Sequence, residues 1–325
     1  WWATLERELE PADLYHACGS LTVAAALAAR ERDRRAGRRS VVVYDAIDDV
    51  IAGNNLLGAP GPARAMIQAR ERGWARAADA RTTVNDALAG PLAARWETDL
   101  PIVIPNWPEQ TLGPESAPPD LIRTRLALPA STRVVVFQGR LGPNLGLDAA
   151  AEAILEVPDA VLCLIGFGRG LAASLARDAD PRFAGRHMTL PAVHPDELLA
   201  WTASADVALV PLPPVSANQR ASTPNKFWEA IAAGTPVVVG PGLPVMAEIV
   251  ARYDLGVVAR SLAPGDLAAA LRKVLDVAPE AALARRRRIA ASAREQFSWP
   301  IAAERYRALV AGLGGLDGPP TAPTL

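Results

Sequence analysis

The feature that most constrains the fold is an alternation of short, β-branched segments with alanine-rich segments of helical length. In the first hundred residues the strand-like segments are DLYHA (13–17), SVVVYDA (40–46), ARTTV (80–84) and PIVIPN (101–106). Helical segments lie between them at 21–36, roughly 61–77 and 85–96. Strands that alternate with helices form βαβ units, in which a parallel sheet is covered on both faces. The pattern therefore predicts an α/β fold.

A second series of strand-like segments follows a proline-rich passage, NWPEQTLGPESAPPDL (106–121), which has no hydrophobic period. The segments are RVVVFQG (133–139), AVLCLIG (160–166), HMTLPAV (187–193), DVALVPL (206–212), PVVVG (236–240) and GVVA (256–259). We therefore predict two α/β domains joined by a linker.

The predicted boundaries follow these two series. We place the N-terminal domain at 1–108, the linker at 109–122 and the C-terminal domain at 123–299. Residues 300–312 are predicted to form a helix that crosses back to the N-terminal domain. Residues 313–325 are rich in glycine and proline and are predicted to be a disordered tail.

Charge and cysteine content exclude several classes of function. The formal net charge of −1 provides no overall field for binding nucleic acid. Cys18 and Cys163 are too few for a disulfide framework or a metal site, so we expect no metal and a reducing, cytoplasmic setting. The basic runs at 30–39 and 285–288 are typical of solvated helix faces, with a peripheral contact at the inner face of a membrane as the alternative.

A glycine-rich turn, LIGFGRG (164–170), follows one of the predicted strands and contains Gly166. A dinucleotide-binding site would also need an acidic residue at the end of the next strand, and HMTLPAV ends without one. We therefore favour a turn that brings strand, helix and a ligand phosphate close together over binding of NAD.

The segment FQGRL (137–141) places Gly139 and Arg140 at the carboxyl end of the first strand of the second series. Ligands of open α/β sheets bind at that edge. Glycine lets a ligand approach the backbone, and arginine can contact two phosphate oxygens at once. The alternative is a tight turn with a solvated arginine.

The segment TPNKFWEAIAAG (223–234) predicts a helix that begins beside a ligand. Thr223, Pro224 and Asn225 form the turn into the helix, whose first-turn N–H groups favour an anion. Of 34 lysines and arginines only two are lysines, and one of them is Lys226. Glu229 lies on the same helical face and could accept hydrogen bonds from two ribose hydroxyls. The alternative is an ordinary surface pair of lysine and glutamate.

These segments together resemble the retaining glycosyltransferases of family 4, the group 1 glycosyl transferases. The resemblance includes DLYHA, VVVYDA, PIVIPNWPE, VVVFQGRL, TPNKFWEAIAAGTPVVVG and FSWP, and it is strongest from about residue 133 to 259. It implies the GT-B fold of two facing Rossmann-like domains, the N-terminal one without its first strands.

The resemblance implies a hexosyltransferase-type enzyme. Such an enzyme moves a sugar from a nucleotide diphosphate sugar to a glycan, lipid-linked or small-molecule acceptor, with retention and without a cofactor or metal. Arg140 and Lys226 would hold the diphosphate, Glu229 the ribose and the loop near Leu190 and Val193 the base. His16, at a strand end of the N-terminal domain, would act near the reacting centre. The remaining donor-binding residues would be Gly139, Gly166, Thr223, Pro224 and Asn225.

The chain departs from the family pattern at four places. Ala221 stands where a glutamate is usual, Leu145 where a basic residue is common, and Cys18 in place of the second histidine of a His-x-His motif. The first strands are missing, which would leave a sheet edge unpaired. We therefore expect a fragment, a homo-oligomer or a partner that covers the edge. The alternative function is a catalytically silent nucleotide-sugar-binding or scaffold protein.

Overall fold

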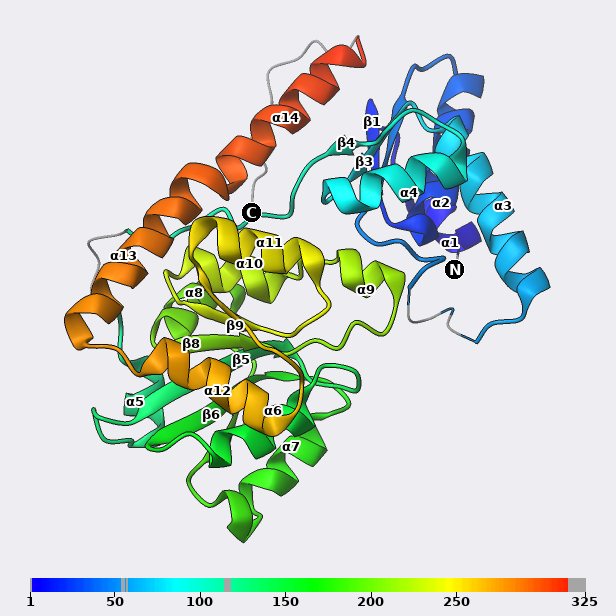
Figure 1. The fold of residues 1–325 in the computed structure, drawn as a ribbon. Coiled ribbons are helices and arrows are strands. Elements are labelled where there is room, and N and C mark those ends of the chain that lie inside the picture. Colours follow the sequence, from blue (N-terminus) through cyan, green and yellow to red (C-terminus); the bar gives the residue numbers. More distant parts are fainter. Residues whose placement is uncertain (1, 54–55, 57, 114–117, 315–325) are drawn as a thin grey trace. The chain divides into compact units, whose positions relative to one another are not determined.

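The computed structural model describes residues 2–53, 56, 58–113 and 118–314, which form two compact units (Figure 1). Unit 1 consists of the described residues up to Asn106 together with those from Pro300, and unit 2 runs from Trp107 to Trp299. The predicted disordered tail lies, from residue 315 onward, outside the described residues.

Unit 1 alternates strands and helices as the sequence predicts. Its strands are β1 (Leu14–Cys18), β2 (Val41–Ala46), β3 (Ala80–Thr83) and β4 (Ile102–Val103). Its helices are α1 (Trp2–Glu8), α2 (Ser20–Arg35), α3 (Gly61–Ala77), α4 (Asp86–Trp96) and α14 (Trp299–Gly312), the last of which begins at the final residue of unit 2.

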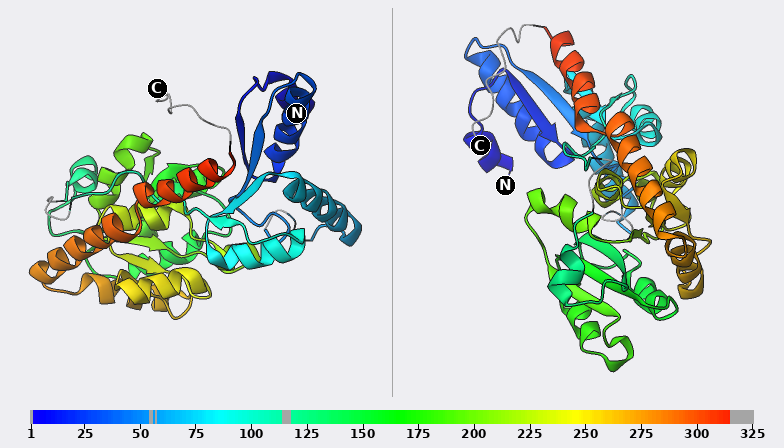
Figure 2. Two further views of the ribbon diagram at one scale, coloured as in Figure 1. Left: turned by 90° about the horizontal axis from the view of Figure 1, so that it is seen from above. Right: turned by 90° about the vertical axis from the view of Figure 1, so that its left-hand side faces the viewer.

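The sheet of unit 1 has the order β1-β2-β3-β4, and all its described pairs are parallel. Helix α2 lies along β1 and β2 (Figure 2). Leu309 of α14 packs against Val43 and Ala80, with Tyr306 beside them. Among the described residues β1 pairs only with β2, so it forms an edge of the sheet.

Unit 2 contains the second series of strands. These are β5 (Arg133–Arg140), β6 (Ala160–Phe167), β7 (His187–Pro191), β8 (Val207–Val210), β9 (Val237–Val239) and β10 (Gly256–Val258). The helices are α5 (Leu121–Leu126), α6 (Leu147–Leu155), α7 (Leu171–Asp178), η2 (Pro181–Phe183), α8 (Pro195–Ala203), α9 (Ala217–Ala221), α10 (Asn225–Ala232), α11 (Pro244–Tyr253), α12 (Pro264–Leu275) and α13 (Pro279–Gln296).

The sheet of unit 2 has the order β10-β9-β8-β5-β6-β7 and is parallel throughout. The chain starts in the middle at β5, builds outward through β6 and β7, and then returns to β8 on the other side of β5. This reversal is a topological switch point, and ligands of doubly wound sheets bind beyond the carboxyl ends of the strands there. The end of β5 therefore marks the expected site.

The strands of unit 2 are buried on both faces, with alternate residues in two separate cores. Val134 and Val136 of β5 contribute to the core beneath α10, α11 and α13. Val135 and Phe137 contribute to the core beneath α6 and α12, on the opposite face (Figure 1). Burial on both faces explains why these strands are almost continuously apolar in sequence.

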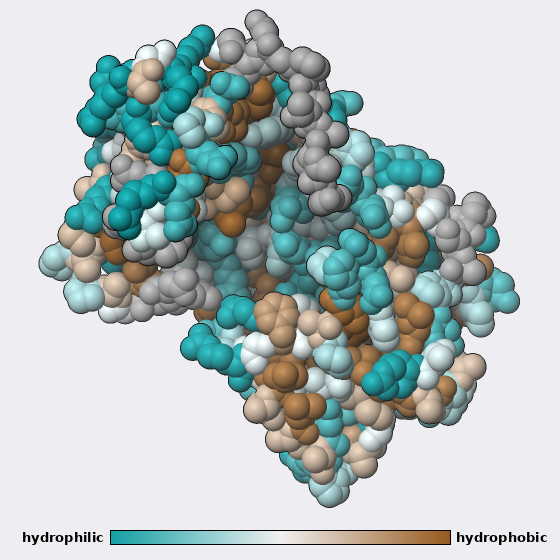
Figure 3. All heavy atoms as spheres, turned by 180° about the vertical axis from the view of Figure 1, so that it is seen from behind, coloured by the Kyte–Doolittle hydropathy of each residue, from teal (hydrophilic) through white to brown (hydrophobic). Residues whose placement is uncertain are grey.

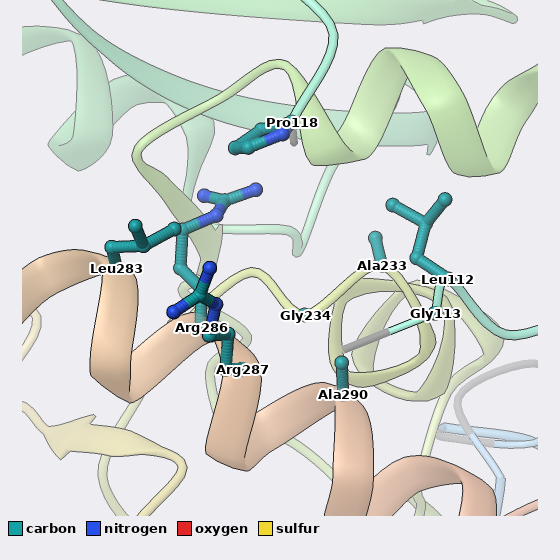
Figure 4. Close-up of a pocket in the computed structure, with 9 residues that line it drawn as sticks. All are labelled: Leu112, Gly113, Pro118, Ala233, Gly234, Leu283, Arg286, Arg287 and Ala290. Atoms are coloured by element: carbon teal, nitrogen blue, oxygen red, sulfur yellow. The ribbon is translucent and has the colours of Figure 1, made fainter. Parts of the chain in front are cut away.

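The four consecutive arginines at 285–288 form the solvated helix face that the sequence predicts only in part, because Arg285 and Arg286 are partly buried whereas the other two are exposed. The guanidinium of Arg286 points inward from α13 and donates to the carbonyl oxygens of Ala203 and Ala205, the latter at 2.7 Å (Figure 4). Burial lowers the pKa of Arg286 to about 10. Arg285 donates to the carbonyl of Val274, and Arg288 pairs with Asp254. Arg285 and Arg286 therefore tie α13 to α12 and to the segment from the end of α8 to β8.

Among the described residues, no helix is both long and apolar enough to cross a membrane. On the face shown in Figure 3, hydrophilic side chains lie between the hydrophobic areas.

We expect Arg286→Met to lower the free energy of unfolding by about 1–3 kcal/mol, because it leaves buried carbonyl oxygens without a donor. Arg287→Met, at the exposed neighbouring position, is the matched control and should change stability by less than about 0.5 kcal/mol. Urea denaturation of both variants checks this. An equal loss of unfolding free energy in both variants would contradict a special role for the hydrogen bonds of Arg286.

Candidate functional site

The end of β5 lies unusually close to the turn that follows β6. A Cβ atom added to Gly166 would stand 2.0 Å from the carbonyl oxygen of Gly139, and one added to Gly168 would stand 2.7 Å from that of Leu141. The amide of Leu141 donates to the carbonyl of Phe167 at 2.6 Å. The glycines of LIGFGRG thus bring strand and turn together, and no larger residue could occupy position 166 without displacing β5.

Helix α10 begins at this same strand end. Its N-cap is Pro224, which has no polar side chain to satisfy the N–H groups of the first turn. The Nζ atom of Lys226 lies 4.9 Å from the centre of the Phe137 ring and 3.6 Å from the position that a Cβ on Gly139 would take. The lysine therefore packs beside Gly139 and is stabilised in part by the aromatic ring.

Glu229 is held by a chain of hydrogen bonds that the sequence did not reveal. The amide nitrogen of Gln138 donates to Oε2 of Glu229 at 2.8 Å, and the hydroxyl of Thr202 donates to the amide oxygen of Gln138. Gln138 is 3% exposed. This arrangement fixes the position of the carboxylate at one turn's distance from Lys226.

The electrostatics of the site favour an additional anion. Burial lowers the pKa of Lys226, the Glu229 carboxylate raises it, and the guanidinium of Arg140 lowers it further. Burial raises the pKa of Glu229, opposed by the hydrogen bond from Gln138 and by the charge of Lys226. Lys226 is thus attracted by one half-buried carboxylate and repelled by a second cation. A bound anion would offset both the burial of the lysine and its repulsion by Arg140.

The other predicted donor-binding residues lie around this strand end. Thr223, Pro224 and Asn225 precede or begin α10. Leu190 is 5% exposed and belongs to the core, so only its backbone could contact a base, whereas Val193 is partly buried in the turn before α8. A hollow of about 230 Å³ is lined by Glu229 together with Pro108, Glu109, Gln110, Pro195, Asp196, Leu198 and Leu199.

Two of the family departures lie in this region. Ala221 ends α9, and Leu145 is partly buried against the cores on both faces of the sheet. The position of Leu145 is therefore occupied by a packing residue, and Gln219 of α9 donates to the carbonyl of the neighbouring Asn144 at 3.4 Å.

His16 belongs to unit 1 and is the third of the five residues of β1, so it does not stand at the strand end where the sequence predicts it. Its ring stacks on Tyr306 of α14 with a centroid distance of 5.2 Å, and its Nδ1 atom lies 3.0 Å from the Tyr306 hydroxyl. Its Nε2 atom lies 3.5 Å from Oδ2 of Asp45. Sequence reasoning missed both partners, because they come from a neighbouring strand and from the last helix. His187 is buried, and its Nδ1 atom lies 2.6 Å from Oδ1 of Asp178.

Comparison with known proteins gives the following relatives. Residues 132–277 match the model of the family described as glycosyl transferases group 1. A D-inositol 3-phosphate glycosyltransferase of Corynebacterium aurimucosum is 33% identical over 215 residues, which cover 61% of this chain and 47% of the relative. The chain thus spans about half the length of the curated relatives that it matches.

Two solved structures show the same fold. HepE of Anabaena, determined in complex with UDP, has a TM-score of 0.69 at 17% identity and covers 96% of this chain and 82% of its own. Sucrose-phosphate synthase of Thermosynechococcus elongatus has a TM-score of 0.66 at 19% identity and covers 92% and 74%. The fold is therefore GT-B, built from two Rossmann-like units, as the sequence predicts.

Gly166→Ala is expected to destabilise the protein by about 1–3 kcal/mol or more, because its Cβ would overlap the Gly139 carbonyl. Gly142→Ala is the matched control. It lies in the facing loop, and its Cβ would meet only the Arg140 guanidinium at 3.9 Å. Thermal unfolding of both variants checks this. A Gly166→Ala variant as stable as Gly142→Ala would contradict the close approach.

Proposed function

We propose that this chain transfers a sugar from a nucleotide diphosphate sugar to an acceptor hydroxyl, because residues 132–277 match the model of the group 1 glycosyl transferases. The observation that carries the proposal is the pair of cations, Arg140 and Lys226, at the switch point of the sheet of unit 2. The lysine there is half-buried. A half-buried lysine beside an arginine is costly unless an anion joins them, and a diphosphate supplies that anion.

The proposed roles follow from position. Lys226 and Arg140 bind the diphosphate, together with the first-turn N–H groups of α10. Glu229, held by Gln138, accepts hydrogen bonds from the ribose. The backbone turn at 190–193 adjoins the base. Gly166 lets the turn after β6 meet the end of β5, and Gly139 lies beside Lys226, so both glycines shape the place where the phosphates would bind.

In the proposed reaction, the bond between the anomeric carbon and the diphosphate oxygen breaks. A bond from the same carbon to the acceptor oxygen forms, on the same face of the sugar ring. The acceptor hydroxyl loses its proton, which leaves with the diphosphate or passes to solvent. Negative charge develops on the leaving diphosphate, and preorganised cations stabilise it more in the transition state than in the ground state. We expect no metal to be required for this step.

A hexose is the sugar we propose, and a uridine nucleotide is the donor to test first. Solved structures of HepE contain UDP, UDP-glucose, or UDP and glucose. The proposed acceptor side is unit 1, where His16 would orient a hydroxyl.

The function is tested by incubating the protein with UDP-glucose, other nucleotide sugars and candidate acceptors, and measuring release of nucleoside diphosphate. Formation of a glycosylated product with the donor's anomeric configuration supports the proposal. Tight donor binding without turnover on any acceptor would overturn it in favour of a silent binding protein.

The two side chains of α10 are expected to act on different parts of the donor. Lys226→Ala should weaken nucleoside diphosphate binding by roughly 10–100-fold, equivalent to about 1.5–3 kcal/mol for bonds to a charged group, and should leave nucleoside binding nearly unchanged. Glu229→Gln should weaken nucleoside and nucleoside diphosphate by similar factors. Calorimetric titration with both ligands separates the two effects.

Lys273→Ala is the matched control, because Lys273 is the other lysine of the chain and is exposed on α12. It should bind both ligands as the unmodified protein does. If Lys226→Ala weakens nucleoside and diphosphate equally, the lysine merely holds the turn, and its role in binding phosphate is wrong.

Diphosphate binding is also expected to take up protons at alkaline pH. Burial lowers the pKa of Lys226 from its ordinary 10.5, so part of the lysine is neutral at a pH where an exposed lysine is charged. A bound diphosphate favours the charged form and raises this pKa. Affinity should therefore fall as pH rises through the pKa of the free protein. Calorimetry in two buffers of different ionisation enthalpy measures the uptake, which Lys226→Ala should abolish.

A further inference from the structure

Three potential metal ligands converge at the carboxyl end of the sheet of unit 1. His16 and Cys18 are two residues apart on β1, so their side chains point to the same face of the strand. In the parallel register of β1 and β2, Cys18 is the partner of Asp45. The sheet therefore places an imidazole, a thiol and a carboxylate side by side.

The spacing of these groups fits a single ion. One ligand atom from each residue can be chosen so that all three lie within 4.8 Å of one another. Bonds of about 2.0–2.3 Å at tetrahedral angles put ligand atoms about 3.3–3.8 Å apart. The Nε2 atom of His16 and the Oδ2 atom of Asp45 are already 3.5 Å apart. Two of the three groups therefore already have the spacing of ligands of one ion, and the thiol of Cys18 lies beside them.

The partners of these side chains orient them for coordination. The hydroxyl of Thr82 donates to Oδ1 of Asp45 at 2.8 Å, which leaves Oδ2 directed toward His16. The Tyr306 hydroxyl lies 3.0 Å from Nδ1 of His16. If Nδ1–H donates to this hydroxyl, Nε2 carries the free electron pair that a metal requires. Such outer partners are typical of histidine and carboxylate ligands in metal sites.

We propose that His16, Cys18 and Asp45 form a binding site for a zinc-like divalent cation. A set of one nitrogen, one sulfur and one oxygen suits Zn²⁺ and its spectroscopic substitute Co²⁺, whereas Mg²⁺ and Ca²⁺ prefer oxygen ligands alone. Three protein ligands leave the fourth position for water or for an oxygen of a bound molecule.

Binding requires one proton to leave the protein. The Cys18 thiol loses its proton to solvent and coordinates as the thiolate, and His16 coordinates through neutral Nε2. No electron is transferred. The site shares His16 with the proposed acceptor side, but it lies in a different unit from the residues that we propose to hold the diphosphate, so its test needs no sugar nucleotide.

The test titrates the reduced protein with Co²⁺ and then with Zn²⁺, in the absence of any nucleotide. We expect one equivalent of Co²⁺ to produce an absorption band from thiolate-to-metal charge transfer, which Zn²⁺ abolishes by displacement. Cys18→Ala should remove the band and weaken Zn²⁺ binding at least tenfold. Cys163→Ala is the matched control, because Cys163 is the other cysteine and is buried in unit 2. This control should retain the band.

A second variant tests the orientation of the histidine. Tyr306→Phe keeps the stacked ring but removes the hydroxyl beside Nδ1, and it should weaken Zn²⁺ binding roughly 10-fold while preserving the charge-transfer band. The proposal is overturned if the unmodified protein shows no such band at one equivalent, or if the band survives in Cys18→Ala. Either result would leave the proposed sugar transfer untouched.

Discussion

The site in unit 2 depends on the contact between two backbone segments, at Gly139 and Gly166. A Cβ atom on Gly166 would overlap the carbonyl oxygen of Gly139, so only glycine fits at position 166. The contact lies at the end of β5, where Lys226 packs beside Gly139 and over the ring of Phe137. A glycine motif that resembles a dinucleotide fingerprint thus serves here to place a cation, which is a steric role and needs no acidic residue on the next strand.

The packing around position 226 also explains why a chain so rich in arginine has a lysine there. The Nζ atom lies 4.9 Å from the centre of the Phe137 ring and 3.6 Å from the position that a Cβ on Gly139 would take. A compact point charge fits there, whereas a planar guanidinium with five N–H groups would need more room and more acceptors. Arg140, at the exposed strand end, has that room. Position 226 therefore holds a lysine and position 140 an arginine, because the exposed strand end has more room for a guanidinium than the half-buried helix start.

Sequence patterns predicted the elements well because apolar content, strand length and helix length agree along the chain. The strands of unit 2 are apolar on both faces, and Gly139, Arg140 and Lys226 could be placed at element ends from their neighbours alone. The pattern could not show what depends on packing across the fold. Gln138 directly precedes Gly139, but its hydrogen bond to Glu229 joins residues that are 91 positions apart in the sequence. Arg286 appeared to be one of four solvated charges, and only the fold shows the carbonyls that it meets.

The same limit applies to Cys18, which the sequence presents as a lost histidine. A thiol has neither of the ring nitrogens with which histidine orients a hydroxyl, so the substitution weakens the case for chemistry at this position. The register of β1 and β2 places Asp45 directly beside the thiol, which indicates a different role for Cys18. Two histidines and a carboxylate would also bind a metal, but sulfur makes the set softer and more selective for zinc-like ions over magnesium. The replacement of a histidine by Cys18 therefore removes a group that could orient a hydroxyl and supplies a thiolate for the proposed metal site, because Asp45 of β2 lies beside it.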